Sequence, residues 1–322
     1  MFNFARIKLT AWYLLTIMFI SIAFSLVIYQ GLIIEVRRFS RTQRLRIERF
    51  DEDIFNEIKQ RIIFELGIIN VFIFLSSGAL GYFLAGKTLQ PIQEMVEEQN
   101  RFISDASHEF RTPLTALKSS LEVNLRDKNL TIEDAKKIMN ENIKDVNDLQ
   151  RLSDSLLQLS QYEKPQSYVN FEKVSLKQII NESIKKIETL AKNKNIDIKN
   201  STINVNIKGN KYGLIDLFIV LLDNAIKYSK IKSTVNINTK KTDHSVLISI
   251  EDHGIGINRK DIPHLFDRFY RSDLARSKKE VSGYGLGLSI AKKIVDQHKG
   301  SINIKSKIKK GTTAVVRLPI FS

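Results

Sequence analysis

Residues 104–117 read Ser-Asp-Ala-Ser-His-Glu-Phe-Arg-Thr-Pro-Leu-Thr-Ala-Leu. Apolar residues in this stretch recur at spacings of three and four, which predicts an amphipathic helix with one face to bury. On such a helix His108 and Thr112 share a face, and Glu109 is the neighbour of the histidine. We therefore expect His108 to project from the wetter side, close to a carboxylate and a hydroxyl.

His108 taken alone is a weak signal, because a single histidine on a helix is more often a solvated or packed side chain than a reacting group. A neutral imidazole is nevertheless a competent nucleophile when a neighbouring carboxylate fixes its tautomer and offsets the developing charge. Glu109 is placed for that role. Pro113 removes a backbone donor and is expected to kink the helix just after the site.

Helical spacing continues on both sides of this stretch. Pro91 suits a first helical turn, and the helix that begins there is predicted to run through His108 to about Arg126. Residues 131–134, Thr-Ile-Glu-Asp, have the spacing of a capping box and predict a second helix that ends near Tyr162. A hairpin of two amphipathic helices buries only one seam, so we expect two copies to form a four-helix bundle in a homodimer.

The composition limits the class of protein. The chain has 322 residues and no cysteine, which predicts roughly two or three domains and excludes disulfides, thiolate nucleophiles and cysteine zinc sites. The formal net charge is +15, and residues 87–322 hold 40 basic against 28 acidic residues. This balance favours anionic lipids, a nucleotide or an acidic protein as partners. It predicts no nucleic-acid partner, because a basic helix or aromatic platform is missing.

Two uncharged runs, Leu9–Ile34 and Leu66–Gly86, are long enough to cross a bilayer. Arg6 and Lys8 precede the first run, as in a signal peptide, but the run is too long and no small-residue cleavage site closes it. We therefore expect two transmembrane helices. Residues 81–88 match the P-loop pattern, but they close a membrane span and lack the strand that a P-loop follows, so we discount nucleotide binding there.

After a predicted linker at 164–170, the pattern of apolar residues changes from purely helical spacing to a mixture of helix and strand patterns. Helices are expected at 176–192, 211–228 and 286–298. Strands are expected at 196–199, 203–207, 234–239, 246–251, 301–305 and 313–318. Consecutive strands late in the chain suggest antiparallel pairing, so this part is expected to be an α+β sandwich with helices on one sheet face.

Three motifs crowd this last part. Residues 221–229 end a helix with an amide and an amine three positions apart, at Asn224 and Lys227. Asp252-His-Gly254-Ile-Gly256 follows a strand, and a run with glycines at 283, 285 and 287 leads into a helix. Glycines before a helix let backbone N–H groups approach phosphate oxygens. Each motif alone is weak, since most such glycines form turns and most such asparagines are caps.

In this order and after the histidine helix, the motifs resemble those of bacterial two-component sensor histidine kinases. Residues 107–114 are similar to the family's H box, 224–229 to its N box and 252–256 to its first glycine box. Residues 263–271 resemble the F box, and 283–288 the second glycine box. The resemblance covers residues 91–320 and implies a phosphoacceptor helical hairpin, followed by an ATP-binding domain of the Bergerat type.

The resemblance also implies a role for each matching residue. ATP would phosphorylate His108, with Glu109 as base and Glu109 and Thr112 serving the reverse, phosphatase reaction, and an aspartate of a cognate response regulator would then receive the phosphoryl group. Asn224 would hold Mg²⁺ and Asp252 would read the adenine. The cofactors are thus ATP and Mg²⁺. The remaining nucleotide-binding positions implied are Lys227, Tyr228, Gly254, Gly256, Phe266, Arg268, Gly283, Gly285 and Gly287, with a mobile lid between Tyr270 and Gly283.

Two departures from the family pattern stand out. Val220 occupies a position where many members carry asparagine, and only 16 residues separate Pro91 from His108, so the usual cytoplasmic linker domain is missing. Signals from the membrane would then travel along one nearly continuous helix. The alternative function is a nucleotide-binding receptor that works mainly as a phosphatase or scaffold.

The topology requires a choice. Residues 35–61 hold eight basic and six acidic residues, and counting the basic ones would keep this loop in the cytoplasm. Two spans put both termini on one side, and use of ATP requires that side to be the cytoplasm, so we expect the loop outside. A multi-pass cell-membrane protein with cytoplasmic kinase domains follows, whose stimulus would come from membrane lipids, an anionic ligand or a partner membrane protein.

The expected organisation assigns each part of the chain a role. The segments are 1–8 (cytoplasmic N-terminus), 9–34 (first transmembrane helix), 35–65 (short extracytoplasmic loop), 66–86 (second transmembrane helix), 87–163 (signalling helix with the dimerisation and histidine phosphotransfer domain), 164–170 (linker) and 171–322 (catalytic ATP-binding domain).

Overall fold

The computed structural model describes residues 2–44, 52–128, 130–162, 170–272 and 283–320. The chain divides into two compact units, residues 1–103 and 104–322, which are described separately. The predicted linker at 164–170, except Asn170, and most of the predicted lid lie outside the described residues. So do the side chains of residues 39–53, which include four arginines of the predicted loop.

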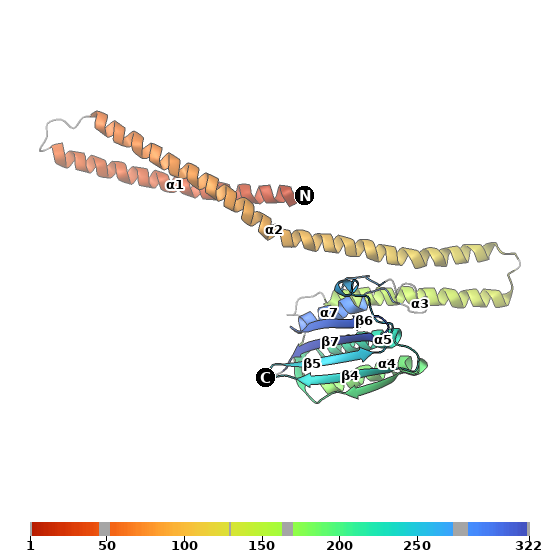
Figure 1. Ribbon diagram of the computed structural model, residues 1–322. Helices are drawn as coiled ribbons and strands as arrows, with labels where there is room; N and C mark the ends of the chain where they lie inside the picture. Colours follow the sequence, from red (N-terminus) through yellow and green to blue (C-terminus); the bar gives the residue numbers. More distant parts are fainter. Residues whose placement is uncertain (1, 45–51, 129, 163–169, 273–282, 321–322) are drawn as a thin grey trace. The chain divides into compact units, whose positions relative to one another are not determined.

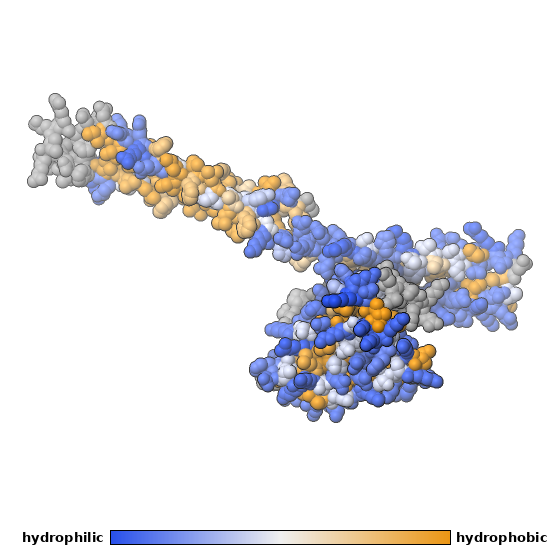
Figure 2. Space-filling view, viewed as in Figure 1, coloured by the Kyte–Doolittle hydropathy of each residue, from blue (hydrophilic) through white to orange (hydrophobic). Residues whose placement is uncertain are grey.

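The first unit is a pair of long helices, α1 (Phe2–Arg44) and the beginning of α2 (Glu52–Arg126). Each contains an apolar segment long enough to cross a membrane, and neither segment is buried inside the protein. Figure 2 shows the hydrophobic side chains as an orange band over these helices, with hydrophilic residues beyond it. Large contiguous apolar surfaces of this kind mark sites of contact with a membrane or with another protein.

Polar contacts fix α1 antiparallel to α2 (Figure 1). Near one end, Arg6 Nε donates to the backbone oxygen of Tyr82 at 3.0 Å. Further along, the Asn70 amide accepts from Ser21 Oγ at 2.6 Å and donates to Ser25 Oγ at 2.8 Å. Hydrogen bonds between side chains in an apolar environment orient membrane helices, because their alternative is an unsatisfied polar group.

The helices continue beyond the predicted spans. Residues 35–44 and 52–65 are helical, so the described parts of the segment expected between the spans consist of helix. They contain no glycine or proline to end a helix. Pro91 also lies inside α2 and not in a first turn. Residues 81–88 are helical, which agrees with rejecting the P-loop.

The second unit begins with the end of α2 and with α3 (Ile132–Tyr162), the two helices of the predicted hairpin. Thr131 caps α3: its hydroxyl accepts from the backbone N–H of Asp134 at 3.1 Å and donates to the Asp134 carboxylate at 2.6 Å. The helix ends at Arg126 and Tyr162 are confirmed. The helix runs unbroken past Pro113.

An α+β domain follows, built on a five-stranded sheet of order β2-β4-β5-β7-β6. β2 pairs with β4 in parallel, and the other neighbours are antiparallel. β1 and β3 form a second, two-stranded sheet, and an isolated bridge joins Ile207 of β3 to Ile320 just after β7. The strands are β1 (Glu172–Ser175), β2 (Asp197–Ser201), β3 (Asn206–Gly209), β4 (Thr234–Lys241), β5 (Ser245–Asp252), β6 (Ser301–Lys307) and β7 (Gly311–Pro319).

Buried and exposed residues alternate along the sheet strands, so one face is covered, by α4 (Leu176–Asn193), α5 (Lys211–Tyr228) and α7 (Gly287–Gln297) (Figure 1). The predicted sandwich is confirmed. β1 and a short 3₁₀ helix, η2 (Ile262–His264), were not predicted. The strand expected at 203–207 begins later, at Asn206.

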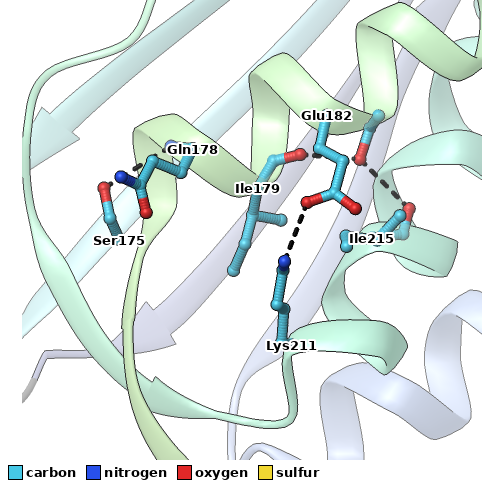
Figure 3. Close-up of polar contacts among 7 residues, drawn as sticks. Ser175, Gln178, Ile179, Glu182, Lys211 and Ile215 are labelled. Atoms are coloured by element: carbon cyan, nitrogen blue, oxygen red, sulfur yellow. Dashed lines mark hydrogen bonds and ion pairs between the residues drawn. The ribbon is translucent and has the colours of Figure 1, made fainter.

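The packing of α4 on α5 includes two polar contacts (Figure 3). The buried Ser183 hydroxyl lies 2.9 Å from the carbonyl of Ile179 on its own helix and 3.2 Å from that of Ile215 on α5. At the rim, Lys211 Nζ lies 3.1 Å from the carboxylate of Glu182. Exposed ion pairs of this kind contribute little, so the apolar side chains between the helices supply most of the stability.

His298, which follows α7, is a buried histidine with a structural role. Its Nδ1 lies 2.7 Å from the carbonyl of Ile294, and its Nε2 accepts from the backbone N–H of Asn210 at 3.0 Å. One nitrogen donates and the other accepts, so the ring is neutral. Burial lowers the pKa of His298, and the hydrogen bond to the Ile294 carbonyl only partly offsets this.

We expect acid to destabilise the protein through His298. Below a pH of about 6.5 the histidine binds a proton in the unfolded chain, while the folded chain resists it. The free energy of unfolding should therefore fall as the pH drops below that value, towards the lowered folded pKa. Denaturant unfolding at pH 7.5 and 5.5 measures this loss. His298→Gln should have a smaller pH dependence than wild type in that window, and an equal one would contradict the assignment.

Candidate active site

The histidine region lies on α2. The His108 side chain is exposed, as predicted, while Glu109 beside it is half-buried. Thr112 is exposed, and its hydroxyl donates to the backbone oxygen of His108 at 3.2 Å. Of these three, only Glu109 lines the large cavity of the second unit. The three residues form a continuous patch with an accessible imidazole.

That cavity measures about 870 Å³, a size suited to a nucleotide. It is bounded by α5, the end of β5, the segment after η2 and the start of α7, and by residues of α2 and α3. It gathers eight of the eleven predicted nucleotide-binding residues. These are Asn224, Lys227, Tyr228, Asp252, Gly256, Gly283, Gly285 and, at the start of α7, Gly287.

Asp252 is the buried carboxylate of the cavity, with 7 % of its surface exposed. Its Oδ1 accepts from the backbone N–H groups of Gly254 at 2.8 Å and Thr312 at 3.2 Å. Burial raises the pKa of Asp252, and these two hydrogen bonds oppose the rise. The carboxylate is therefore fixed in one orientation, with two donors on the same oxygen.

The C-terminal turn of α5 supplies the polar wall. Lys227 Nζ pairs with Asp223 Oδ2 at 2.6 Å, and both residues line the cavity beside Asn224. Lys194 holds the end of this helix, because its Nζ donates to the carbonyls of Ile226 at 3.0 Å and Lys227 at 2.6 Å. A cation on the last carbonyls of a helix satisfies acceptors that lack helical donors.

Two glycines are needed for close backbone approach. Gly285 has φ of +74°, and a Cβ there would lie 2.6 Å from the Tyr270 carbonyl oxygen. Gly256 has φ of +71°, and a Cβ would collide with the backbone of Lys307. Only glycine adopts such conformations without strain and without a clash. Val220 also lines the cavity, so an apolar side chain stands where many family members have asparagine.

Three predicted residues lie outside the cavity wall. Gly254, Phe266 and Arg268 are not among the residues that line it. Tyr270 and Arg271 from the same segment do line it. Residues 273–282 of the predicted lid, which was placed between Tyr270 and Gly283, are outside the described residues.

Helix α3 contacts the α+β domain through its last turns. Gln158 Nε2 and the Tyr162 hydroxyl both donate to Asp216 Oδ2 at 2.7 Å, and Gln297 Nε2 donates to the backbone oxygen of Tyr162 at 2.8 Å. Burial and the Asp216 carboxylate raise the pKa of Tyr162, so the phenol stays protonated and donates. These contacts bring the cavity next to α3.

Sequence reasoning missed several cavity residues. Asp148 and Arg151 of α3 form an ion pair on the cavity wall, and Tyr284 lies between two glycines of the second glycine motif. Burial raises the pKa of Tyr284, and the charge of Glu109 adds to this. Of these residues, only Tyr284 could have been found from the sequence, because it lies within a glycine motif. Nothing in the sequence distinguishes the Asp148–Arg151 pair from other charged residues on a helix.

Comparison with known families agrees with this geometry. Residues 98–165 match the His Kinase A (phospho-acceptor) domain, and residues 209–321 match the histidine kinase-, DNA gyrase B- and HSP90-like ATPase. The signal transduction histidine-protein kinase ArlS of Staphylococcus aureus is 35 % identical over 225 residues, 70 % of this chain and 50 % of that protein. The chain therefore spans about half the length of the curated relatives it matches.

Solved structures share the fold. The histidine kinase AdeS of Acinetobacter baumannii superposes with a TM-score of 0.54 at 23 % identity, over 67 % of this chain and 98 % of AdeS. The histidine kinase ThkA, solved in complex with the response regulator TrrA, gives 0.59 at 20 % identity over 73 % of this chain and 66 % of ThkA. A phosphoacceptor domain, an ATPase domain and the arrangement of their motifs place this chain in the family of two-component sensor histidine kinases.

Proposed function

We propose that this protein phosphorylates itself on His108 with ATP and passes the phosphoryl group to an aspartate of a response regulator. The observation that carries the proposal is the composition of one cavity. Residues of the nucleotide motifs line it together with Glu109, the direct neighbour of an exposed imidazole. Phosphoryl transfer depends on positioning and charge neutralisation, which a nucleotide site close to a nucleophile can supply.

Each residue then has a role in the reaction. His108 would attack the terminal phosphorus of ATP while the bond from that phosphorus to the bridging oxygen breaks and ADP leaves, and Glu109 would accept the proton from the imidazole. Asp252 accepts a hydrogen bond from the adenine amino group. Thr112, with Glu109, orients water in the reverse reaction. The glycines at 256, 283, 285 and 287 shape the pocket, and Gly254 acts through its hydrogen bond to Asp252. Lys227 and Tyr228 lie by the nucleotide, while Phe266 and Arg268, which are outside the cavity wall, act with the lid.

The side chains of the cavity fit a magnesium ion shared with a nucleotide. Among the described residues there is no group of three carboxylates or histidines that could hold a metal. Asn224 offers one amide oxygen, and the nearby Asp223 is paired with Lys227. Mg²⁺ commonly takes one or two protein ligands and completes its shell with phosphates and water. Bound there, it would neutralise the phosphate charge.

A homodimer follows from the apolar residues left exposed on α3. Ile143 and Val146 lie on the apolar seam predicted for this helix and are 57 % and 49 % exposed in the single chain, whereas Leu152 and Leu159 further along the seam are buried. A second copy of the hairpin would cover this seam. The phosphoacceptor match supports the same arrangement.

The membrane placement rests on α1 and α2. We place both helices across the cell membrane, with the N-terminus and the kinase domains in the cytoplasm and the segment 35–65 outside. ATP is available only on the cytoplasmic side. A phosphatase or scaffold that binds nucleotide without transferring phosphate is the alternative, and the accessible imidazole beside the nucleotide cavity favours the kinase.

Incubation of the full-length protein in detergent with γ-labelled ATP tests the proposal. We expect a covalent label that is stable to alkali and lost in acid, since a phosphorus–nitrogen bond hydrolyses when the ring is protonated. Chelation of divalent cations should prevent labelling. An acid-stable label, which indicates a phosphorylated hydroxyl, would contradict the proposal, as would no label under conditions where nucleotide binds.

A further inference from the structure

A second cavity, of about 480 Å³, lies where α1 begins against α2. Its basic side chains are Arg6 and Lys87, and no Asp or Glu is among the residues that line it. Arg6 precedes the apolar run of α1, and Lys87 follows the apolar run of α2. Since the helices are antiparallel, both residues lie at the same end of the apolar band, where the span meets water.

The structure holds the Arg6 side chain in place. Its Nε donates to the Tyr82 carbonyl at 3.0 Å, and its guanidinium lies 3.6 Å from the centre of the Tyr82 ring. Gly86 makes this possible, because a Cβ at that position would come within 2.6 Å of the guanidinium carbon. A cation stacked on an aromatic face is ordered before any ligand binds, which lowers the entropy cost of binding.

Neither basic group is neutralised by the protein. Within the part of the chain that the structure describes, neither Arg6 nor Lys87 forms an ion pair with a carboxylate. The amides of Gln90 and Gln93 add hydrogen-bonding groups to the wall, each with one bond to a glutamate on the next turn, at 2.9 Å. The residues that line the cavity therefore carry two positive charges and spare donors, and the carboxylates of Glu94 and Glu97 lie one turn further along α2.

We propose that this cavity binds the phosphate headgroup of an anionic phospholipid from the cytoplasmic leaflet. The inference rests on the membrane placement proposed above. Apolar side chains, Phe2, Phe83 and Leu89, complete the wall, which suits the glycerol and acyl portions of a lipid better than a free phosphate ion. The bound headgroup bridges α1 and α2.

The position of the cavity gives the lipid a route to the kinase. The wall includes Gln93, and His108 is only 15 residues further along the same helix. A headgroup that joins the two helices at this end would fix the tilt of α2 before it enters the phosphoacceptor domain. Anionic lipid content would thereby set the basal output.

Lipid binding by the full-length protein tests the inference directly. The protein is placed in nanodiscs of phosphatidylcholine with and without phosphatidylglycerol, and bound lipid is measured by native mass spectrometry without ATP. We expect retention of phosphatidylglycerol, with affinity about tenfold to thirtyfold lower in the double variant R6Q/K87Q. A matched control, K8Q/R101Q, removes two basic residues that lie outside the cavity and should keep wild-type affinity.

A second variant separates geometry from charge. Gly86→Ala leaves the net charge unchanged but displaces the Arg6 guanidinium, so it should also weaken binding. Equal losses of phosphatidylglycerol affinity in R6Q/K87Q and K8Q/R101Q would overturn the inference, because they would show that only the overall surface charge matters. Displacement of the bound lipid by millimolar inorganic phosphate would also overturn it, because the site would then bind free phosphate as well as a lipid headgroup. The lipid-binding measurement uses no ATP, so loss of the lipid proposal would not bear on autophosphorylation of His108. That reaction is measured separately with labelled ATP.

Discussion

Replacing His108 by Gln is expected to abolish the acid-labile label that the wild-type protein takes from γ-labelled ATP. Glutamine has similar volume and polarity at an exposed helical position, so the fold should be unchanged. Its amide nitrogen is not a nucleophile, and no phosphorus–nitrogen bond can form. We expect a loss of about 10³-fold or more, to the background of the assay.

The control for this variant is His244→Gln. His244 is exposed in the turn between β4 and β5 and does not line the cavity, so its replacement should leave labelling intact. Nucleotide affinity should equal that of wild type in both variants. Retention of the label by His108→Gln would contradict the assignment of His108 as the phosphoacceptor.

Asp252→Asn is expected to weaken ATP binding by about 10- to 100-fold, the range for losing a hydrogen bond to a charged group. The remaining oxygen of the asparagine can still accept from Gly254 and Thr312, so the turn should keep its shape. The new amide nitrogen cannot accept from the adenine amino group, and two donors would face each other. Isothermal titration with ATP measures the change.

The pH dependence gives an independent reading of the same contact. Because burial raises the pKa of Asp252, its carboxylate gains a proton at a higher pH than an exposed one. As the pH is lowered, the ATP affinity of the wild type should therefore begin to fall at a higher pH than the titration of an exposed carboxylate predicts. The exposed neighbour Glu251 provides the control: its charge is the smallest of the causes that act on the raised pKa of Asp252, so Glu251→Gln should leave the affinity near neutral pH unchanged and move the loss only slightly, to lower pH. Unchanged affinity in Asp252→Asn would remove this residue from adenine recognition.

Local patterns in the sequence were sufficient for most of the elements. The helix over 211–228 has apolar residues at all of its core-facing positions. The apolar residues after it no longer recur at helical spacing, so both ends of the helix were predicted correctly. The cap at Thr131 and the helix end at Tyr162 also depend on residues close in sequence and could be predicted from them. The nucleotide cavity could be anticipated because its glycines and its buried Asp252 lie in recognisable motifs.

Features that depend on distant residues could not be predicted. Lys194 caps α5 from the turn after α4, and Thr312 donates to Asp252 from a strand sixty residues away. The contact of Tyr162 with Asp216 likewise joins groups that no spacing relates. The boundaries of β1 and β3 depend on their pairing with each other, and four-residue strands carry too little pattern to stand out.

Pro91 illustrates the opposite error. Its fixed φ suits a first helical turn, and a local rule therefore placed a helix start there. In the structure α2 continues through it, because the helical residues on both sides outweigh one lost hydrogen bond. The result is a single helix from the second span to Arg126, which connects the lipid-facing segment to His108.

The position of the transferred phosphate is the central claim, and peptide mapping tests it most directly. After reaction with ATP, trypsin digestion at alkaline pH should release residues 102–111, a peptide with one histidine and two serines. Tandem mass spectrometry with electron-transfer fragmentation is expected to place the phosphate on His108. A phosphate on Ser104 or Ser107, or on a peptide from elsewhere in the chain, would contradict the account.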